Sequence, residues 1–233
     1  MSHRGATPWR RVDLNGYHAP RRYAIRLFDP VVIICDRSMH DTALAVRGVL
    51  ESFCLQPLLY RCVQQRNVLD ALAGQIPPSE YVVLACHGVP EENRLFFTVV
   101  QEVADQQDVW GNSECSLTPA NIPDLVQLPS RTIVSLACGS GRDPVARAFL
   151  AAGCRAFSGP LGTPDMDAAL MHTCAFFYHL LAAEHDPALH HSEREAAMRA
   201  VAFDAESRAG TAMFRYSARE GAAVRDGHRR ADG

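Results

Sequence analysis

Residues 131–141 read RTIVSLACGSG, and this stretch predicts a buried strand that ends in a tight turn. Apolar, β-branched runs of this length, bounded by turn residues, are typical of strands buried on both faces of a parallel sheet. The strand ends at Cys138, and the glycines that follow let the chain turn. Asp143 and Pro144 have the residue types of an N-cap and a first helical position. The stretch therefore predicts a strand–turn–helix unit.

The same alternation of apolar runs and helical periodicity extends on both sides of this unit. It implies an α/β fold with an open, mostly parallel sheet and helices on both faces. Residues 88–117 look irregular, with a short strand at residues 95–100 in a hairpin at the rim of a site. We expect strands at residues 31–35, 58–63, 81–86, 131–138, 154–159 and, at an edge, 213–218, and helices at residues 41–53, 67–75, 145–153, 168–184 and 191–207.

Composition predicts one soluble core in this chain of 233 residues, which is 48% hydrophobic and carries a net charge of −3. No apolar run reaches the roughly 18 residues that span a bilayer, and no apolar leader segment opens the chain. The eight cysteines lack the spacing of a disulfide framework, which favours a reducing cytoplasm. We expect a basic extension at residues 1–28, a folded domain at 29–218 and a disordered tail at 219–233. The slightly acidic balance argues against a nucleic-acid partner.

His87 and Cys138 follow two of the expected strands, at the sheet edge where α/β sites form. A thiol near its ordinary pKa of about 8.5 is mostly unreactive at neutral pH, and it needs a nearby imidazole as a proton acceptor and donor. Gly88 allows the backbone to approach a substrate closely. The N–H groups of Gly88 and Cys138 are therefore expected to form an oxyanion hole.

Other interpretations of these residues remain open. A cysteine at the end of an apolar strand is usually a small buried hydrophobe, and Cys35 and Cys86 occupy similar positions. A zinc site would need paired ligand spacings that are absent around these residues, so no metal and no cofactor is expected. The glycine-rich turn also lacks the GK[ST] ending of a phosphate-binding loop. His172, His179, His190 and His191, on or near the C-terminal helices, are expected to be packing or surface residues.

In this order, the residues resemble the CHAT domain, a bacterial relative of caspases and separase among the clan CD cysteine peptidases. His87 precedes Cys138 by 51 residues, and caspase-type enzymes have their His about 50 residues before the Cys. The resemblance implies a caspase-like three-layer sandwich. It covers most of the chain and rests on YVVLACHG (81–88), RLFFT (94–98), LTPANIPDLVQLPSRTIVSLACGSG (117–141), ARAFLAAGCRAFSGPLGTPDMDAA (146–169) and the FFYHLL helix (176–181).

The resemblance also implies roles for particular positions. His87 would be the catalytic histidine and Cys138 the nucleophile. The acidic segment of the family falls on Asp165 and Asp167, which would bind substrate, with Asp165 holding a basic P1 side chain. The alternative is that Asp165 only caps the helix that follows. Gly162 stands where the family has Trp, and Gly139 where relatives often have a polar residue, so substrate preference departs from the family pattern.

Together these features predict a cysteine endopeptidase that cleaves specific protein partners after a basic P1 residue and that stays latent until a partner protein activates it. The alternative is a catalytically silent caspase-like module that binds proteins as a scaffold, since fold alone does not imply function. A flavodoxin-like binder of small molecules would need a glycine-rich loop after the first strand, and residues 36–42 offer none. No membrane association is expected.

Overall fold

The computed structural model describes residues 30–53, 55–102, 110–185, 193–207 and 213–219. The predicted basic extension and, apart from Arg219, the predicted disordered tail lie outside the described residues.

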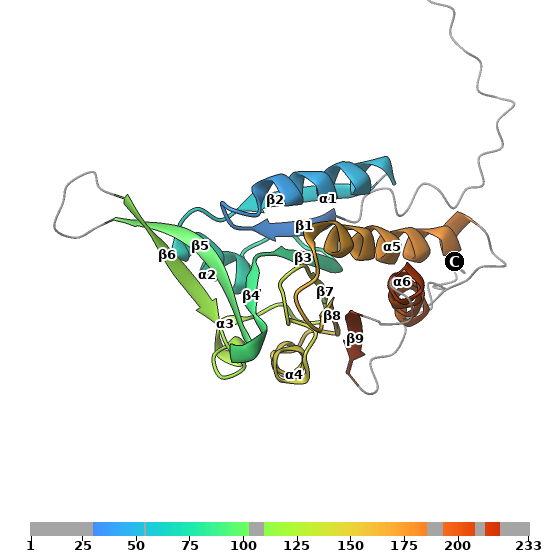
Figure 1. Ribbon diagram of the computed structural model, residues 1–233. Helices are drawn as coiled ribbons and strands as arrows, with labels where there is room; N and C mark the ends of the chain where they lie inside the picture. The colour runs from blue at the N-terminus through green and yellow to red at the C-terminus, as the bar shows by residue number, and fades with distance from the viewer. Residues whose placement is uncertain (1–29, 54, 103–109, 186–192, 208–212, 220–233) are drawn as a thin grey trace, which may run out of the picture.

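A six-stranded sheet forms the centre of the molecule, with the strand order β2-β1-β3-β7-β8-β9 (Figure 1). The first five of these strands are parallel, and β9 closes one edge in antiparallel pairing with β8. The predicted α/β class and the predicted edge strand are therefore confirmed. The strands span Pro30–Cys35 (β1), Gln56–Arg61 (β2), Tyr81–Ala85 (β3), Thr132–Ser135 (β7), Ala156–Pro160 (β8) and Phe214–Ala218 (β9).

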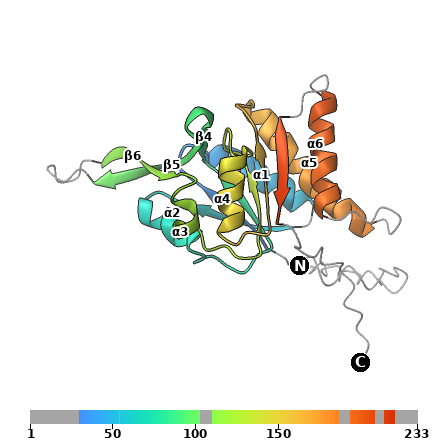
Figure 2. The ribbon, with the colours of Figure 1, turned by 90° about the horizontal axis from the view of Figure 1, so that it is seen from below.

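Helices cover both faces of this sheet, as the alternation of elements predicted. Successive side chains of β1 point to opposite faces, so Val32 and Ile34 pack into one core cluster and Val31 and Ile33 into the other. Fully burying each of these side chains stabilises the fold by about 1.5–3 kcal/mol. One face carries α1 (His40–Ser52), α5 (Met166–His185) and α6 (Glu193–Ser207), and the other α2 (Gln65–Leu72), α3 (Ile122–Leu125) and α4 (Asp143–Ala151). Seen from below, α4 lies in front of the sheet and α1 behind it (Figure 2).

A second, antiparallel sheet extends from the body of the molecule (Figure 1). It consists of β4 (His87–Val89), β5 (Arg94–Glu102) and β6 (Trp110–Leu117), with the 3₁₀ turn η1 (Pro90–Glu92) between β4 and β5. The expectation of an irregular segment with one short strand is wrong, because β5 and β6 are both long strands. The expected hairpin is present. Leu95, Phe97 and Val99 are buried on one face of β5, and this alternation was the signal for a long strand.

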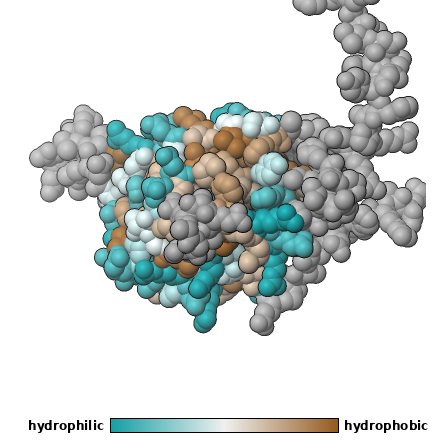
Figure 3. All heavy atoms as spheres, turned by 45° about the vertical axis from the view of Figure 1, so that its right-hand side comes forward, coloured by the Kyte–Doolittle hydropathy of each residue, from teal (hydrophilic) through white to brown (hydrophobic). Residues whose placement is uncertain are grey.

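Several apolar side chains remain exposed on the side of the molecule that carries α5 and α6. Figure 3 shows apolar surface among polar side chains in the view that brings this side forward. Among the described side chains of these two helices, the exposed large apolar residues are Met166, Met171, Tyr178, Met198 and Phe203. Within the described ranges, the helices are too short or too polar to cross a bilayer.

Candidate active site

The pairing of β3 with β7 brings the two predicted catalytic positions to one edge of the sheet. Leu84 pairs with Ser135. The chain then leaves β3 at Ala85 and reaches His87 at the start of β4, while β7 gives way to the Cys138 turn. The strand predicted to reach Cys138 ends instead at Ser135. The reason is local, because the Ser135 hydroxyl accepts the N–H of Ala137 at 3.2 Å and the chain begins to turn there.

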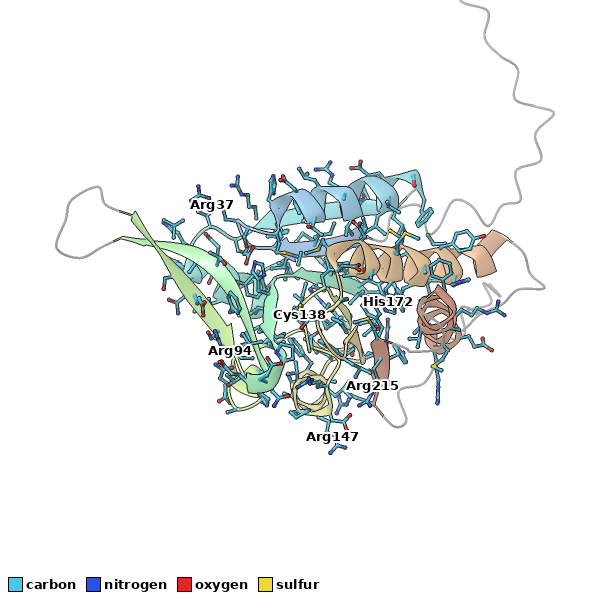
Figure 4. The ribbon with its side chains drawn as sticks, viewed as in Figure 1. Arg37, Arg94, Cys138, Arg147, His172 and Arg215 are labelled. Atoms are coloured by element: carbon cyan, nitrogen blue, oxygen red, sulfur yellow. The ribbon has the colours of Figure 1, made fainter. Side chains whose placement is uncertain are left out.

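Gly88 lies directly against the backbone of Cys138. A Cβ built on Gly88 would come within 2.0 Å of the Cys138 carbonyl oxygen, a distance that no side chain tolerates. Figure 4 shows Cys138 beside β4. The strand that carries His87 and the turn that carries Cys138 are therefore in backbone contact.

Neighbouring segments hold the Cys138 turn from two sides. The Gly139 N–H donates to the Gly162 carbonyl at 2.8 Å, and the Gly141 N–H to the Pro160 carbonyl at 2.7 Å. Gly139 has a φ of +68°, and a Cβ there would come within 2.7 Å of Pro90. Only glycine combines this backbone conformation with so close an approach. The turn is thus fixed between the end of β8 and η1.

Arg142 connects these two flanking segments. Its guanidinium group donates to the Leu161 carbonyl at 2.9 Å and to the Pro90 carbonyl at 2.6 Å. This role could not be predicted from the sequence, because nothing in the local pattern shows where the side chain of Arg142 lies. The expectation for Asp143 is corrected at the same point. Helix α4 begins at Asp143 with Arg142 as its N-cap, and the Asp143 carboxylate instead pairs with Arg215 of β9.

Cys138 differs from the other strand-end cysteines in exposure. Cys35 and Cys86 are at most 1% exposed, whereas Cys138 is partly accessible to solvent. Partial burial raises the pKa of the Cys138 thiol, and hydrogen bonds from its own backbone and from the Thr163 side chain offset part of this effect. The resting sulfur is therefore a thiol at neutral pH, and it needs a base during attack.

The His87 ring is held from two directions. It stacks on Phe96 with ring centroids 5.2 Å apart and an interplanar angle of 23°. Its Nε2 lies 2.7 Å from the Ser38 hydroxyl, which in turn donates to Asp36 at 2.7 Å. Among the described residues, no hydrogen bond joins the imidazole to the Cys138 sulfur, so the two catalytic candidates are brought together through their backbones.

Asp36 and Ser38 follow β1 at the same edge of the sheet. No role was expected from the sequence for either residue. A polar pair directly after a buried parallel strand was the available signal. What the sequence alone does not show is that the loop after β1 reaches His87, because that depends on the order of the strands.

Asp165 and Asp167 lie on the segment that follows Thr163. The Asp165 carboxylate accepts the N–H of Ala168 at 2.8 Å, which is the geometry of an N-cap on α5. Asp167 lies in the first helical turn, and both acids are exposed. A Cβ built on Gly162 meets no atom within 4 Å, so the position of the family's Trp opens onto free space. No contact of either acid with His87 or Cys138 is seen in the described residues.

His172 lies away from this edge, inside the protein (Figure 4). Its Nε2 lies 3.0 Å from the Ser158 hydroxyl, and its ring stacks on Phe214 at 4.0 Å. His172 is thus a packing residue, which is one of the two roles expected for it. Within the described ranges, no three His, Cys, Asp or Glu side chains are placed to hold a metal ion.

Comparisons with known proteins bear on the fold. No family model matches the chain, and no curated protein matches its sequence. Among solved structures, the complex of the pro- and mature domains of RgpB from Porphyromonas gingivalis matches with a TM-score of 0.52 and 12% sequence identity. The match covers 81% of this chain and 47% of that chain, so this chain spans about half the length of that neighbour. At this identity the likeness shows the fold alone, and the fold is the caspase-like α/β sandwich that the resemblance implied.

Proposed function

We propose that this protein is a cysteine endopeptidase of the caspase-like type, with Cys138 as nucleophile and His87 as general base and acid. The observation that carries the proposal is the backbone contact between Gly88 and Cys138. It supports an arrangement in which the thiol, the imidazole and two backbone N–H groups face the same substrate carbonyl. The fold shared with RgpB, which is a clan CD cysteine peptidase, supports the same class of chemistry.

The reaction starts from a neutral thiol, because burial raises the pKa of Cys138. As the sulfur attacks the scissile carbonyl carbon, His87 takes the thiol proton, and the carbonyl oxygen becomes an oxyanion. The N–H groups of Gly88 and Cys138 are the proposed donors to that oxyanion. Among the described residues, no backbone carbonyl accepts the Cys138 N–H, which in the resting protein donates to the sulfur of its own residue.

The tetrahedral intermediate collapses when the imidazolium gives its proton to the leaving amine. The carbon–nitrogen bond breaks, and an acyl-thioester remains on Cys138. His87 then takes a proton from water, the resulting hydroxide attacks the thioester, and the proton returns to the sulfur as the acid leaves. One difficult hydrolysis is thereby divided into two easier steps.

Protein substrates with a basic P1 residue fit the charge of the segment beside Cys138. Thr163 of this segment contacts the sulfur, and the exposed acids Asp165 and Asp167 follow it directly. The open space at Gly162 leaves room for a long side chain there. An exposed carboxylate attracts Arg or Lys and repels Asp or Glu. Asp165 and Asp167 are therefore the proposed substrate-binding acids.

Latency until activation by a partner protein is part of the proposal. The RgpB structure contains a pro-domain together with the mature domains. Among the described residues, the His87 ring bonds Ser38 and makes no hydrogen bond to the Cys138 sulfur, and the activating partner would bring the imidazole and the thiol within reach of each other.

The test is a fluorogenic peptide library varied at P1, cleaved by the wild type beside Cys138→Ala. Cys174→Ala is the matched control, because Cys174 is likewise partly accessible but lies on α5. Cleavage after Arg or Lys that is lost only in Cys138→Ala is the expected result. Cleavage that persists in Cys138→Ala overturns the assignment of the nucleophile.

The second candidate function is a catalytically silent module that binds a protein partner. The exposed apolar side chains on α5 and α6, among them Met171, Tyr178 and Met198, favour a contact surface away from Cys138. This function predicts that Cys138→Ala retains every measurable property of the wild type.

A further inference from the structure

The loop after β1 holds an aligned chain of hydrogen bonds that ends on the His87 ring. The Ser38 hydroxyl lies 2.7 Å from Asp36 Oδ1 on one side and 2.7 Å from His87 Nε2 on the other. Asp36 is 0% exposed, although it follows β1 at the rim of the sheet. A carboxylate buried so completely is costly unless its oxygens are satisfied.

Backbone donors satisfy those oxygens and fix the direction of the chain. Asp36 Oδ1 accepts the N–H of Met39 at 2.8 Å, and Oδ2 accepts the N–H of Thr98 at 2.8 Å. With the Ser38 hydroxyl, three donors converge on Asp36, which is the pattern of an ionised carboxylate that only accepts. The Ser38 hydroxyl therefore donates its proton to the Asp36 carboxylate.

This direction determines the tautomer of His87. Because the Ser38 hydroxyl donates its proton to Asp36, the Ser38 oxygen can only accept a hydrogen bond from its second partner. That partner is Nε2 of His87. Nε2 must then carry the proton in the neutral ring, and Nδ1 keeps the lone pair. Phe96 stacks on the ring and limits its rotation about the side-chain axis.

We propose that Ser38, held by the buried carboxylate of Asp36, is a positioning residue that keeps His87 in its Nε2–H tautomer and makes Nδ1 the nitrogen that exchanges protons with Cys138. This inference rests on the proposed function for its catalytic meaning, but the tautomer is a property of the resting protein. When Nδ1 takes the thiol proton, Nε2–H remains on Ser38 and the Ser38 proton remains on Asp36. The imidazolium is then stabilised by the Ser38 oxygen, whose negative partial charge is increased because its proton is donated to Asp36.

Ser38 suits a test by substitution because it is exposed and adds little to the core. Asp36 does not, because a change there would leave the buried N–H of Met39 and the partly buried N–H of Thr98 without an acceptor. Ser38→Ala removes the hydroxyl, and Ser38→Thr retains it. Ser52→Ala is the matched control, since Ser52 is also exposed and its hydroxyl donates to the Val49 carbonyl at the end of α1.

The first measurement is the long-range ¹H–¹⁵N correlation spectrum of the histidine-labelled protein, recorded about two pH units above the ordinary imidazole pKa of about 6.5. The wild type, Ser38→Thr and Ser52→Ala are expected to show His87 with a protonated Nε2 and an unprotonated Nδ1. Ser38→Ala is expected to show a mixture of both tautomers. A wild-type ring protonated on Nδ1, or a Ser38→Ala ring identical to the wild type, overturns the proposal.

The second measurement is the rate of alkylation of Cys138 by iodoacetamide and, where cleavage is found, of peptide hydrolysis. Ser38→Ala is expected to slow hydrolysis about tenfold to a hundredfold without changing KM, because loss of the correct tautomer removes general-base assistance. Ser38→Thr is expected to restore the rate. If the wild type cleaves nothing but shows the Nε2–H tautomer lost in Ser38→Ala, the positioning role stands and the proposed function fails. A Ser38→Ala protein with wild-type hydrolysis overturns the catalytic role of the positioning.

Discussion

Gly88 and the Cys138 carbonyl are in contact so close that a Cβ on Gly88 would lie 2.0 Å from the carbonyl oxygen. The obstacle is backbone, so it cannot move aside as the end of a flexible side chain can. We predict that Gly88→Ala separates β4 from the Cys138 turn. The expected loss of unfolding free energy is about 1–3 kcal/mol, as for other overpacked sites, and hydrolysis is expected to disappear.

The control for Gly88→Ala is Gly48→Ala on α1. A Cβ at Gly48 meets no atom within 4 Å, and alanine favours a helix by about 0.5–1 kcal/mol over glycine. Urea unfolding of both variants should therefore shift in opposite directions. A Gly88→Ala protein that unfolds and cleaves like the wild type would contradict the contact.

Arg142 supplies a second test of how the turn is held. We predict that Arg142→Gln loses both guanidinium hydrogen bonds to Pro90 and Leu161 and costs about 1–3 kcal/mol, because a hydrogen bond from a charged group is worth more than a neutral one. The rate of peptide hydrolysis should fall together with the stability, since the segments on both sides of Cys138 are no longer held by Arg142. Thermal unfolding and peptide cleavage measure the two effects.

Arg147→Gln is the matched control on the same helix. The Arg147 side chain is 80% exposed and pairs, among the described residues, with Asp143, four residues earlier. Exposed pairs of this kind contribute little, so its unfolding should be close to that of the wild type. Equal losses in both variants would argue against a specific role for Arg142.

The chemistry of Cys138 gives a prediction in pH. Because burial raises the pKa of this thiol, its alkylation by iodoacetamide should accelerate only above the range in which an ordinary cysteine ionises. Thr163→Val removes a hydrogen bond that lowers the pKa, so the alkylation profile should move to still higher pH. The folded pKa lies above the unfolded one, so the associated stability is present at neutral pH and is lost as pH rises through the folded value. A profile that moves to lower pH in Thr163→Val would contradict the hydrogen bond.

The comparison of sequence and structure separates local signals from long-range ones. Apolar runs such as residues 31–35 and 81–86 predicted strands because burial on both faces leaves a pattern in the sequence itself. The Cys138 turn was predicted from its glycines, which are likewise a signal within the local sequence. The Arg142 contacts reach Leu161, 19 residues away, and Pro90, 52 residues away, and the Ser38 hydrogen bond reaches His87, 49 residues away. No local pattern carries that information.

The open space at Gly162 predicts a change of preference without a loss of fold. Gly162 lies beside the Cys138 turn through its carbonyl, which accepts the Gly139 N–H, yet a Cβ there meets nothing within 4 Å. We predict that Gly162→Trp folds normally and narrows the space available to a P1 side chain. The P1 library should then show weaker cleavage after long side chains. Gly141→Ala is the contrasting variant, since its Cβ would lie 2.1 Å from the Gly159 carbonyl oxygen and should destabilise the protein.

Asp165 allows its two proposed roles to be separated, because asparagine caps a helix as well as aspartate but carries no charge. We predict that Asp165→Asn keeps the hydrogen bond from the Ala168 N–H and unfolds at the wild-type temperature. Cleavage after Arg and Lys should nevertheless fall relative to cleavage after uncharged residues. Asp165→Ala should show the same change of preference and lose about 1 kcal/mol as well, since the cap is removed. If Asp165→Asn cleaves after Arg and Lys as the wild type does, Asp165 caps α5 and does not bind the P1 side chain. The same measurement on Asp167→Asn then decides whether Asp167 binds the basic P1 side chain instead.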